Sequence, residues 1–240
     1  MHIDLNCDLG EGSGHDADLM PLITSANIAC GGHAGDESTM RATVALAQQH
    51  GVTMGAHPGY ADRAGFGRRE MNSSADELRL LLRSQIAALA LLAKLRHVKP
   101  HGGLYNLAAR DKAVATTVAA AVKAIDSSLI LFALAGSELA RAGRAAGLRV
   151  AEEAFADRTY QRDGSLTPRY RPDALIVDEA VAAAQVLHMV RDGFVRTTEG
   201  VQIPIHADTV CVHGDGPNAV GFARRLRTEL INAGVEVKAF

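Results

Sequence analysis

Residues 4–12 of the chain read Asp4-Leu5-Asn6-Cys7-Asp8-Leu9-Gly10-Glu11-Gly12, a short strand that runs into a glycine-rich turn. Because side chains alternate along a strand, Leu5 and Leu9 face one side, and Asp4, Asn6 and Asp8 face the other. A strand cannot bury three polar groups in a dry core without partners. The centre of a parallel barrel supplies such partners, since other strands bring matching groups there. The simpler alternative is an edge strand with solvated aspartates.

The same unit, a short strand followed by a polar loop and a helix, returns along the chain. Further strands are predicted at residues 26–30, 52–56, 97–100, 129–133, 148–155 and 209–212, with a remnant strand at 235–240. Helices are predicted to begin at the capping residues Asp36, Ser74, Asp111, Ser137 and Asp178. The helix that follows Ser74 is expected to run to about Arg96.

Strands that alternate with helices imply right-handed crossovers and a parallel sheet. About seven such units in 240 residues favour an α/β fold, a TIM-like barrel of about seven parallel strands, formed by one domain over residues 1–240. An open, doubly wound sheet is the alternative. It would need a phosphate-binding glycine turn of standard spacing after the first strand, which residues 10–14 lack.

Bulk composition excludes several classes of protein. The net charge of −2 gives no electrostatic reason to expect nucleic acid or a membrane surface as partner. The longest apolar run is broken by Lys94 and Arg96, and the N-terminus enters the first strand without a secretory signal. The three cysteines, Cys7, Cys30 and Cys211, are isolated and odd in number. They argue against a disulfide framework, so a cytoplasmic protein is predicted.

Chemically active side chains collect where the predicted strands end: Asp8, Glu11, His33, Asp36, His57, Lys99, His101, Asp157, His213 and Asp215. In barrels of this kind the carboxyl ends of the strands form the active face. Four histidines at four strand ends converge only if the barrel forms. A hydrogen-bonded network that merely holds the loops is the alternative interpretation.

Alternation along the strands sorts these groups further. Cys7 points away from Asp8 toward the helices, as a core residue would, whereas Lys99 and His101 share the face expected to line the barrel. A lysine beside carboxylates holds charge or polarises a carbonyl. Aspartates and histidines that converge suit either a divalent metal or a general acid–base pair. No HExxH, CxxC or P-loop motif decides between them.

The segment after the third strand carries Arg63, Arg68 and Arg69 around Gly65-Phe66-Gly67. Arginines in such a loop clamp a carboxylate or a phosphate, and the glycines resemble the hinges of a lid. The alternative is an ordinary solvated surface loop.

Together, these segments resemble the LamB/YcsF family from the first strand to the last. The residues that carry the resemblance are Asp4–Glu11, Ala26–Asp36, Gly55–Tyr60, Gly65–Arg69, Val98–Asn106, Glu153–Arg158 with Tyr160 and Asp163-Gly164, and Cys211–Asp215. The family is the A subunit of the prokaryotic ATP-dependent 5-oxoprolinase. The resemblance implies a barrel similar to the glycoside hydrolase/deacetylase superfamily. It also implies cleavage of 5-oxo-L-proline to L-glutamate with ATP as co-substrate, together with two other subunits, B and C.

This chemistry predicts roles for individual residues. We expect Asp8, Glu11, Lys99 and His101 to be catalytic. Substrate or phosphate contacts are expected from Asn6, His33, Arg63, Arg68, Arg69, Tyr105, Asp157, His213 and Asp215. A divalent metal held by Asp8, His57 and His101 is left open. Gly32, where the family usually has an aromatic residue, is expected to widen the mouth beside His33.

Two other functions compete with this interpretation. A deacetylase-like Asp/His/His site would make the chain a metal-dependent carbohydrate or amide hydrolase that works alone. A non-enzymatic scaffold subunit is disfavoured, because a scaffold does not need convergent Asp, His and Lys side chains. The sequence leaves open which subunit binds ATP and whether the chain forms homo-oligomers.

Overall fold

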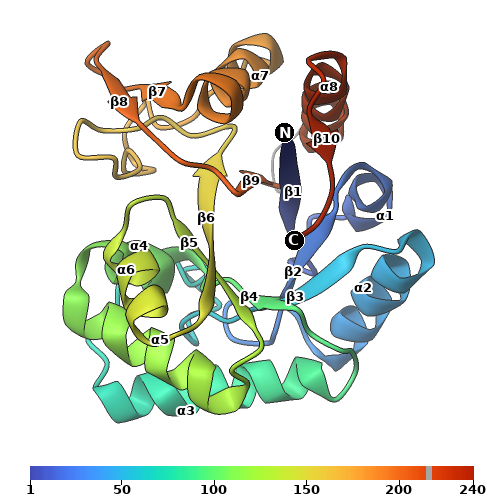
Figure 1. Cartoon of the computed structure of the whole chain (residues 1–240). Helices are drawn as coiled ribbons and strands as arrows, with labels where there is room; N and C mark the ends of the chain where they lie inside the picture. Colours follow the sequence, from blue (N-terminus) through green and yellow to red (C-terminus); the bar gives the residue numbers. More distant parts are fainter. Residues whose placement is uncertain (215–217) are drawn as a thin grey trace.

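The computed structural model describes residues 1–214 and 218–240, and its main feature is a closed parallel barrel (Figure 1). Within these residues the barrel has seven strands: β1 (His2–Leu9), β2 (Ser25–Ala29), β3 (Thr53–His57), β4 (His97–Val98), β5 (Ile130–Leu134), β6 (Arg149–Phe155) and β9 (Thr209–Val212). Strand β1 pairs with both β2 and β9, which closes the ring. The predicted barrel is confirmed, and the open doubly wound sheet is wrong.

Helices follow the strands and pack around the outside of the barrel (Figure 1). They are α1 (Asp16–Leu19) with the 3-10 turn η1 (Met20–Leu22), α2 (Glu37–His50), α3 (Ala75–Ala90), α4 (Gly102–Arg110), α5 (Lys112–Ile125), α6 (Glu138–Ala145), α7 (Glu179–Leu187) continued by the π-helical turn η2 (His188–Asp192), and α8 (Ala219–Asn232). No helix in the described part of the chain is long and apolar enough to cross a membrane.

All five predicted caps are confirmed by side-chain hydrogen bonds. Asp36, Asp111, Ser137 and Asp178 each accept a bond from a backbone N–H in the first turn of α2, α5, α6 and α7. Ser74 and Glu77 form a complete capping box at the start of α3. These bonds satisfy N–H groups that have no partner within the helix, which is why short polar residues mark the helix starts so reliably.

The structure differs from the prediction in three places. Helix α3 ends at Ala90 rather than near Arg96, because the chain must turn there to bring Arg96 N–H to the carbonyl of Met54 in β3. Helix α4 was not expected, since it opens with the poor helix formers Gly102 and Gly103. Residues 194–204 form an unpredicted hairpin of β7 (Phe194–Arg196) and β8 (Gln202–Pro204). The predicted C-terminal remnant is β10 (Glu236–Val237), which pairs with the start of β1.

The inside of the barrel is polar, as the alternation in β1 predicts. Asp4 accepts hydrogen bonds from Ser25 Oγ at 2.7 Å and Thr209 Oγ1 at 2.5 Å. One layer higher, Asn6 accepts a bond from Asn27 Nδ2 at 2.7 Å. Leu5, Cys7 and Leu9 face the helices within the main apolar core. The interpretation of β1 as a solvated edge strand is therefore wrong, because its polar groups find partners on neighbouring strands.

His97 lies in this inner layer as a buried, neutral histidine. Its Nε2 bonds to Asn27 Oδ1 at 2.7 Å and its ring stacks on Phe132. Burial, followed by the charge of Lys99, lowers the pKa of His97 to about 3. A histidine in an unfolded chain titrates near about 6.5, so between these values the unfolded chain binds more protons than the folded one.

The free energy of unfolding is therefore expected to decrease as the pH falls from about 6.5 toward the folded pKa, by up to about 1.4 kcal/mol per pH unit from this residue. Denaturant titrations at several pH values, on the wild type and on His97→Gln, measure the effect. In the variant, the free energy of unfolding should fall less steeply as the pH is lowered, because close to one proton fewer is taken up on unfolding. An identical pH dependence in both proteins would contradict the account.

Candidate active site

A cavity of about 770 Å³ opens at the carboxyl ends of the barrel strands. Its floor contains side chains that were predicted from the strand ends: Asp8, Glu11, His57, Lys99, His101 and His213. The loop between β6 and α7, helix α4 and the start of α6 supply the walls. The barrel therefore brings together groups that lie far apart in the sequence.

Lys99 is the buried cation at the centre of the floor, only 2% exposed. Its Nζ lies 2.8 Å from Asp8 Oδ1 and 2.8 Å from Glu153 Oε1, and it also contacts Cys211 Sγ at 3.1 Å. Burial alone would lower the pKa of Lys99, but the two carboxylates outweigh it and hold the pKa well above its usual value. Lys99 is thus a fixed positive charge beneath the cavity.

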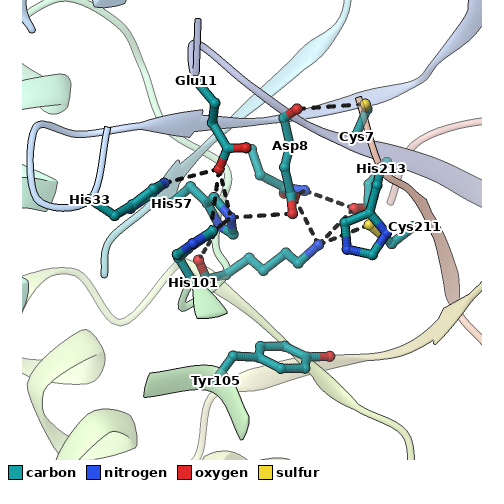
Figure 2. Close-up of polar contacts among 12 residues, drawn as sticks. Cys7, Asp8, Glu11, His33, His57, His101, Tyr105, Cys211 and His213 are labelled. Atoms are coloured by element: carbon teal, nitrogen blue, oxygen red, sulfur yellow. Dashed lines mark hydrogen bonds and ion pairs between the residues drawn. The ribbon is translucent and has the colours of Figure 1, made fainter. Parts of the chain in front are cut away.

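Three histidines gather around Glu11 beside this lysine, which makes a group of four side chains (Figure 2). Glu11 Oε1 lies 2.9 Å from His33 Nε2, 3.4 Å from His101 Nδ1 and 3.8 Å from His57 Nε2. His33 stacks face to face on His101, with ring centroids 3.6 Å apart. The four residues come from the loops and strand ends after β1, β2, β3 and β4, so only closure of the barrel assembles them.

Backbone carbonyls fix the orientation of two of these histidines. His57 Nδ1 bonds to the carbonyl of Lys99 at 2.8 Å, and His101 Nε2 bonds to the carbonyl of Phe66 at 2.9 Å. Because a carbonyl only accepts, each of these nitrogens carries a proton. The remaining nitrogens, His57 Nε2 and His101 Nδ1, face each other at 2.9 Å. Two such atoms either share a proton or bind a common cation.

Electrostatics places the shared proton on His57. Burial opposes the charged form, but the neighbouring Asp8 carboxylate outweighs it and raises the pKa of His57. Burial and the charge of His57 lower the pKa of His101 well below the usual value. His57 therefore donates to a neutral His101, and its Nε2 also lies 3.3 Å from Asp8 Oδ2.

Two more pairs complete the floor. His213 Nδ1 lies 2.8 Å from both carboxylate oxygens of Asp157, which leaves its Nε2 for the cavity. Tyr105 donates its hydroxyl proton to Glu153 at 2.6 Å. Asn6 lies one layer deeper, where its Nδ2 donates to Glu153 Oε1 at 3.0 Å. Glu153 is not among the predicted site residues, although alternation along β6 places it on the same face as Phe155, which lines the cavity, and could have found it.

Residues 63–69, which carry three arginines, lie at one wall of the cavity and are bonded to the rest of the protein. Arg63 donates to the carbonyls of Gly31 and Gly35, and Arg69 pairs with Asp62, so both are engaged within the protein. Arg68 lines the cavity, with its guanidinium 4.8 Å from the centroid of the Phe66 ring. Gly103 N–H donates to the carbonyl of Gly67 at 2.8 Å, and His101 holds Phe66, so the segment predicted as a hinged lid is anchored at its centre.

The other predictions concern single residues. Gly32 does not widen the mouth: a Cβ there would lie 2.5 Å from Gln85 Oε1 and 2.6 Å from the carbonyl of Gly59, so the residue packs against α3. Asp215 lies outside the described residues. Cys7 lies in the apolar core, as alternation predicts, and the Cys211 thiol faces Lys99 inside the barrel.

Two groups of side chains in the cavity have the composition of metal sites. Glu11, His33, His57 and His101 have ligand atoms within 4.8 Å of one another, and so do Asp8, Cys211 and His213. Of the predicted set of Asp8, His57 and His101, the two histidines lie in the first group and Asp8 lies in the second, with its Oδ1 bound to Lys99 and Asn27 and its Oδ2 3.3 Å from His57 Nε2. Carbonyl-oriented imidazoles beside a carboxylate are typical ligands of a divalent cation.

The closed parallel barrel with helices around it is a TIM-like α/β barrel, with a charged floor at the carboxyl ends of its strands. A family 4 carbohydrate esterase from Streptomyces lividans shares the fold, with a TM-score of 0.51 and 12% identity over 98% of this chain and 91% of that one. The LamB/YcsF family matches residues 3–240. The chain belongs to this family.

Relatives with much higher identity match over nearly their whole length. The 5-oxoprolinase A subunit of Tolumonas auensis is 53% identical over 99% of this chain and 98% of its own. That of Methylococcus capsulatus is 56% identical over 99% of this chain and 95% of its own. The crystal structure of a lactam utilization protein from Thermus thermophilus superimposes with a TM-score of 0.93, at 46% identity and full coverage of both chains.

Proposed function

We propose that this chain is the A subunit of an ATP-dependent 5-oxoprolinase, which opens 5-oxo-L-proline to L-glutamate together with two other subunits, B and C. The observation that carries the proposal is the full-length identity to relatives of that name, at 53% and above. The convergent charges in the barrel mouth support a catalytic rather than a scaffolding role.

The reaction explains why such a site is needed. A five-membered lactam is an unreactive amide, so its carbonyl carbon must be activated before water attacks. Transfer of the γ-phosphoryl group of ATP to the lactam oxygen releases ADP and makes that carbon a good electrophile. A first water adds to the carbon and the ring C–N bond breaks, which gives the free amine and an acyl phosphate. A second water then attacks the acyl carbon, and phosphate leaves with the former lactam oxygen, so two waters are used for each glutamate formed. The site must supply positive charge for the oxygens and a base for the water.

We assign these tasks to the residues on the cavity floor. Lys99, held charged by Asp8, supplies the fixed positive charge beneath the lactam oxygen. Glu11 accepts the proton of the attacking water, and the neutral His101, which accepts from His57 Nε2 and donates to the carbonyl of Phe66, is held beside that carboxylate. Arg68 on the wall contacts the phosphoryl group. Tyr105 and His213 on the cavity lining position the substrate, while His33 and Asp157 lie behind them and hold Glu11 and His213 in place.

The histidine cluster also favours a divalent cation as part of the site. His57 Nε2, His101 Nδ1 and Glu11 Oε1 are positioned as ligands, and His33 lies beside them with its buried Nδ1 unpaired among the described residues. A cation bound there would polarise an oxygen of the substrate or of ATP. These ligands are the specific reason to keep a second candidate, a metal-dependent amide or carbohydrate hydrolase that works alone.

Metal binding is expected to stabilise the protein. Addition of Zn²⁺ or Mn²⁺ to chelator-treated chain should raise the melting temperature, because a ligand that binds only the folded state adds RT ln(1 + [L]/Kd) to the free energy of unfolding. His101→Ala should reduce that shift, whereas His188→Ala, which changes an exposed histidine outside the cavity, should not. Equal shifts in both variants would place the cation elsewhere.

An isotope experiment tests the proposed chemistry. Assembled enzyme is given 5-oxo-L-proline labelled with ¹⁸O in the lactam carbonyl. The account predicts that the label appears in the released phosphate, since phosphoryl transfer to that oxygen precedes ring opening. Label retained entirely in glutamate would contradict it. Ring opening without ATP, dependent on bound metal, would establish the second candidate instead.

A further inference from the structure

Several arginines line the cavity wall, and they differ in what they contact. Arg110 pairs with Glu70, and Arg141 pairs with Glu138 at 2.8 Å. Arg158 and Arg169 also line the cavity, but neither forms an ion pair with a carboxylate in the part of the chain that the structure describes. The sequence prediction included neither of these two as site residues.

Arg158 is a nearly buried cation, 4% exposed, directly after β6. Its Nη2 donates to the carbonyl of Thr167 at 2.6 Å and its Nε donates to the carbonyl of Ala174 at 3.3 Å. A guanidinium carries five N–H donors, so these two contacts leave others unused. Burial, with the added charge of Arg169, lowers the pKa of Arg158 to about 10, although the nearby Asp157 carboxylate opposes this shift.

Arg169 lies on the other arm of the same loop. The two arms are joined by bridges between Arg158 and Leu175 and between Tyr160 and Leu166. Asp157 is the carboxylate whose pKa both arginines help to lower, but its two oxygens already accept from His213. Two guanidinium groups thus lie at one wall of the cavity beside His213, where an anion would relieve their mutual repulsion.

We propose that Arg158 and Arg169 form an oxyanion-binding site in this wall, which takes the carboxylate of a cyclic-amide acid or a phosphoryl group of the nucleotide. The identity of these two ligands rests on the proposed function, whereas the existence of the site rests on the arginines alone. A cavity of about 770 Å³ is in the range that holds drug-sized ligands, so it has room for more than one small lactam.

Binding to the full chain, measured by titration calorimetry, tests the site directly. The probes are 5-oxo-L-proline, the neutral lactam 2-pyrrolidinone, inorganic phosphate and ATP. The variants are Arg169→Ala and Arg169→Lys, with Arg162→Ala as the control, since Arg162 is an exposed residue of the same loop that does not line the cavity. Arg169 has no hydrogen bond or ion pair to lose within the described residues, so its removal should leave the fold intact.

We expect Arg169→Ala to weaken the binding of 5-oxo-L-proline, or of phosphate and ATP, by at least about 10-fold, because charge-assisted hydrogen bonds are lost. Arg169→Lys should be intermediate, and Arg162→Ala and 2-pyrrolidinone should show no change. Weakened 5-oxo-L-proline binding identifies the carboxylate as the ligand, and weakened phosphate and ATP binding identifies the phosphoryl group. Unchanged affinities for all the anions, or no binding of any anion to the wild type, would overturn the site.

The assembled enzyme separates this proposal from the proposed function. If the wild type releases glutamate and Arg169→Ala does so with unchanged KM values for both substrates, the oxyanion site is wrong and the function stands. If the wild type releases no glutamate from 5-oxo-L-proline but phosphate binding still depends on Arg169, the function is wrong and the site stands.

Discussion

Asp8→Asn in the assembled enzyme is expected to reduce glutamate release by about 10²–10⁴-fold. Asp8 contacts two cations of the cavity floor: its Oδ1 lies 2.8 Å from Lys99 Nζ and its Oδ2 lies 3.3 Å from the protonated His57 Nε2. The amide keeps the shape but removes the negative charge that keeps His57 protonated. His101→Ala is expected to lose activity to a similar degree, because it removes the nitrogen that faces His57.

Steady-state rates of glutamate formation for both variants, with circular dichroism to confirm folding, measure this effect. Asp36→Asn is the matched control, since Asp36 also follows a barrel strand but caps α2 and lies outside the cavity. Near-normal rates in Asp8→Asn and His101→Ala would show that the cavity floor is a structural network rather than the active site.

Lys99→Met is expected to have the largest effect on stability, a loss of about 3–5 kcal/mol in the free energy of unfolding, with activity abolished. The thioether fills the space of the lysine stem but leaves Asp8 and Glu153 as two buried carboxylates without their shared cation. One of them must then take up a proton or remain unpaired, and both outcomes destabilise the folded state.

A double variant separates stability from catalysis. Lys99→Met combined with Glu153→Gln should recover part of the lost stability, because one buried charge is removed, but it should not recover activity. Lys94→Met, on the exposed segment after α3, is the control and should behave as the wild type. Urea titrations measure the stabilities. A stable Lys99→Met single variant would contradict the central place given to this ion pair.

Much of the fold could be predicted from local rules. The alternation in β1 predicted which side chains face the inside of the barrel, and the short polar residues at helix starts predicted all five caps. Local rules failed where tertiary contacts decide where a helix begins or ends. Gly102 and Gly103 open helix α4 against their propensity because the backbone of Arg69 passes within 2.6 Å of where a Gly103 Cβ would lie. Helix α3 ends early to align β4 with β3.

The candidate site could be predicted only in part, for a physical reason. Side chains at strand ends converge in any closed barrel, so Asp8, His57 and His101 could be found from the predicted strands. The partners of loop side chains are invisible in sequence, which is why Arg63 and Arg69 were expected in the site although Arg63 binds the carbonyls of Gly31 and Gly35 and Arg69 binds Asp62. Arg158 and Arg169 were missed because a long loop sets their direction.

One measurement tests the central claim most directly: release of L-glutamate from 5-oxo-L-proline and ATP, by this chain alone and then with the two candidate partner subunits. The account predicts that glutamate appears only in the complete mixture, in proportion to ADP, and disappears when Asp8→Asn replaces the wild-type chain. No glutamate from a mixture that is shown to assemble would contradict the assigned substrate. The metal-dependent hydrolase that works alone would then be the better account of the same cavity.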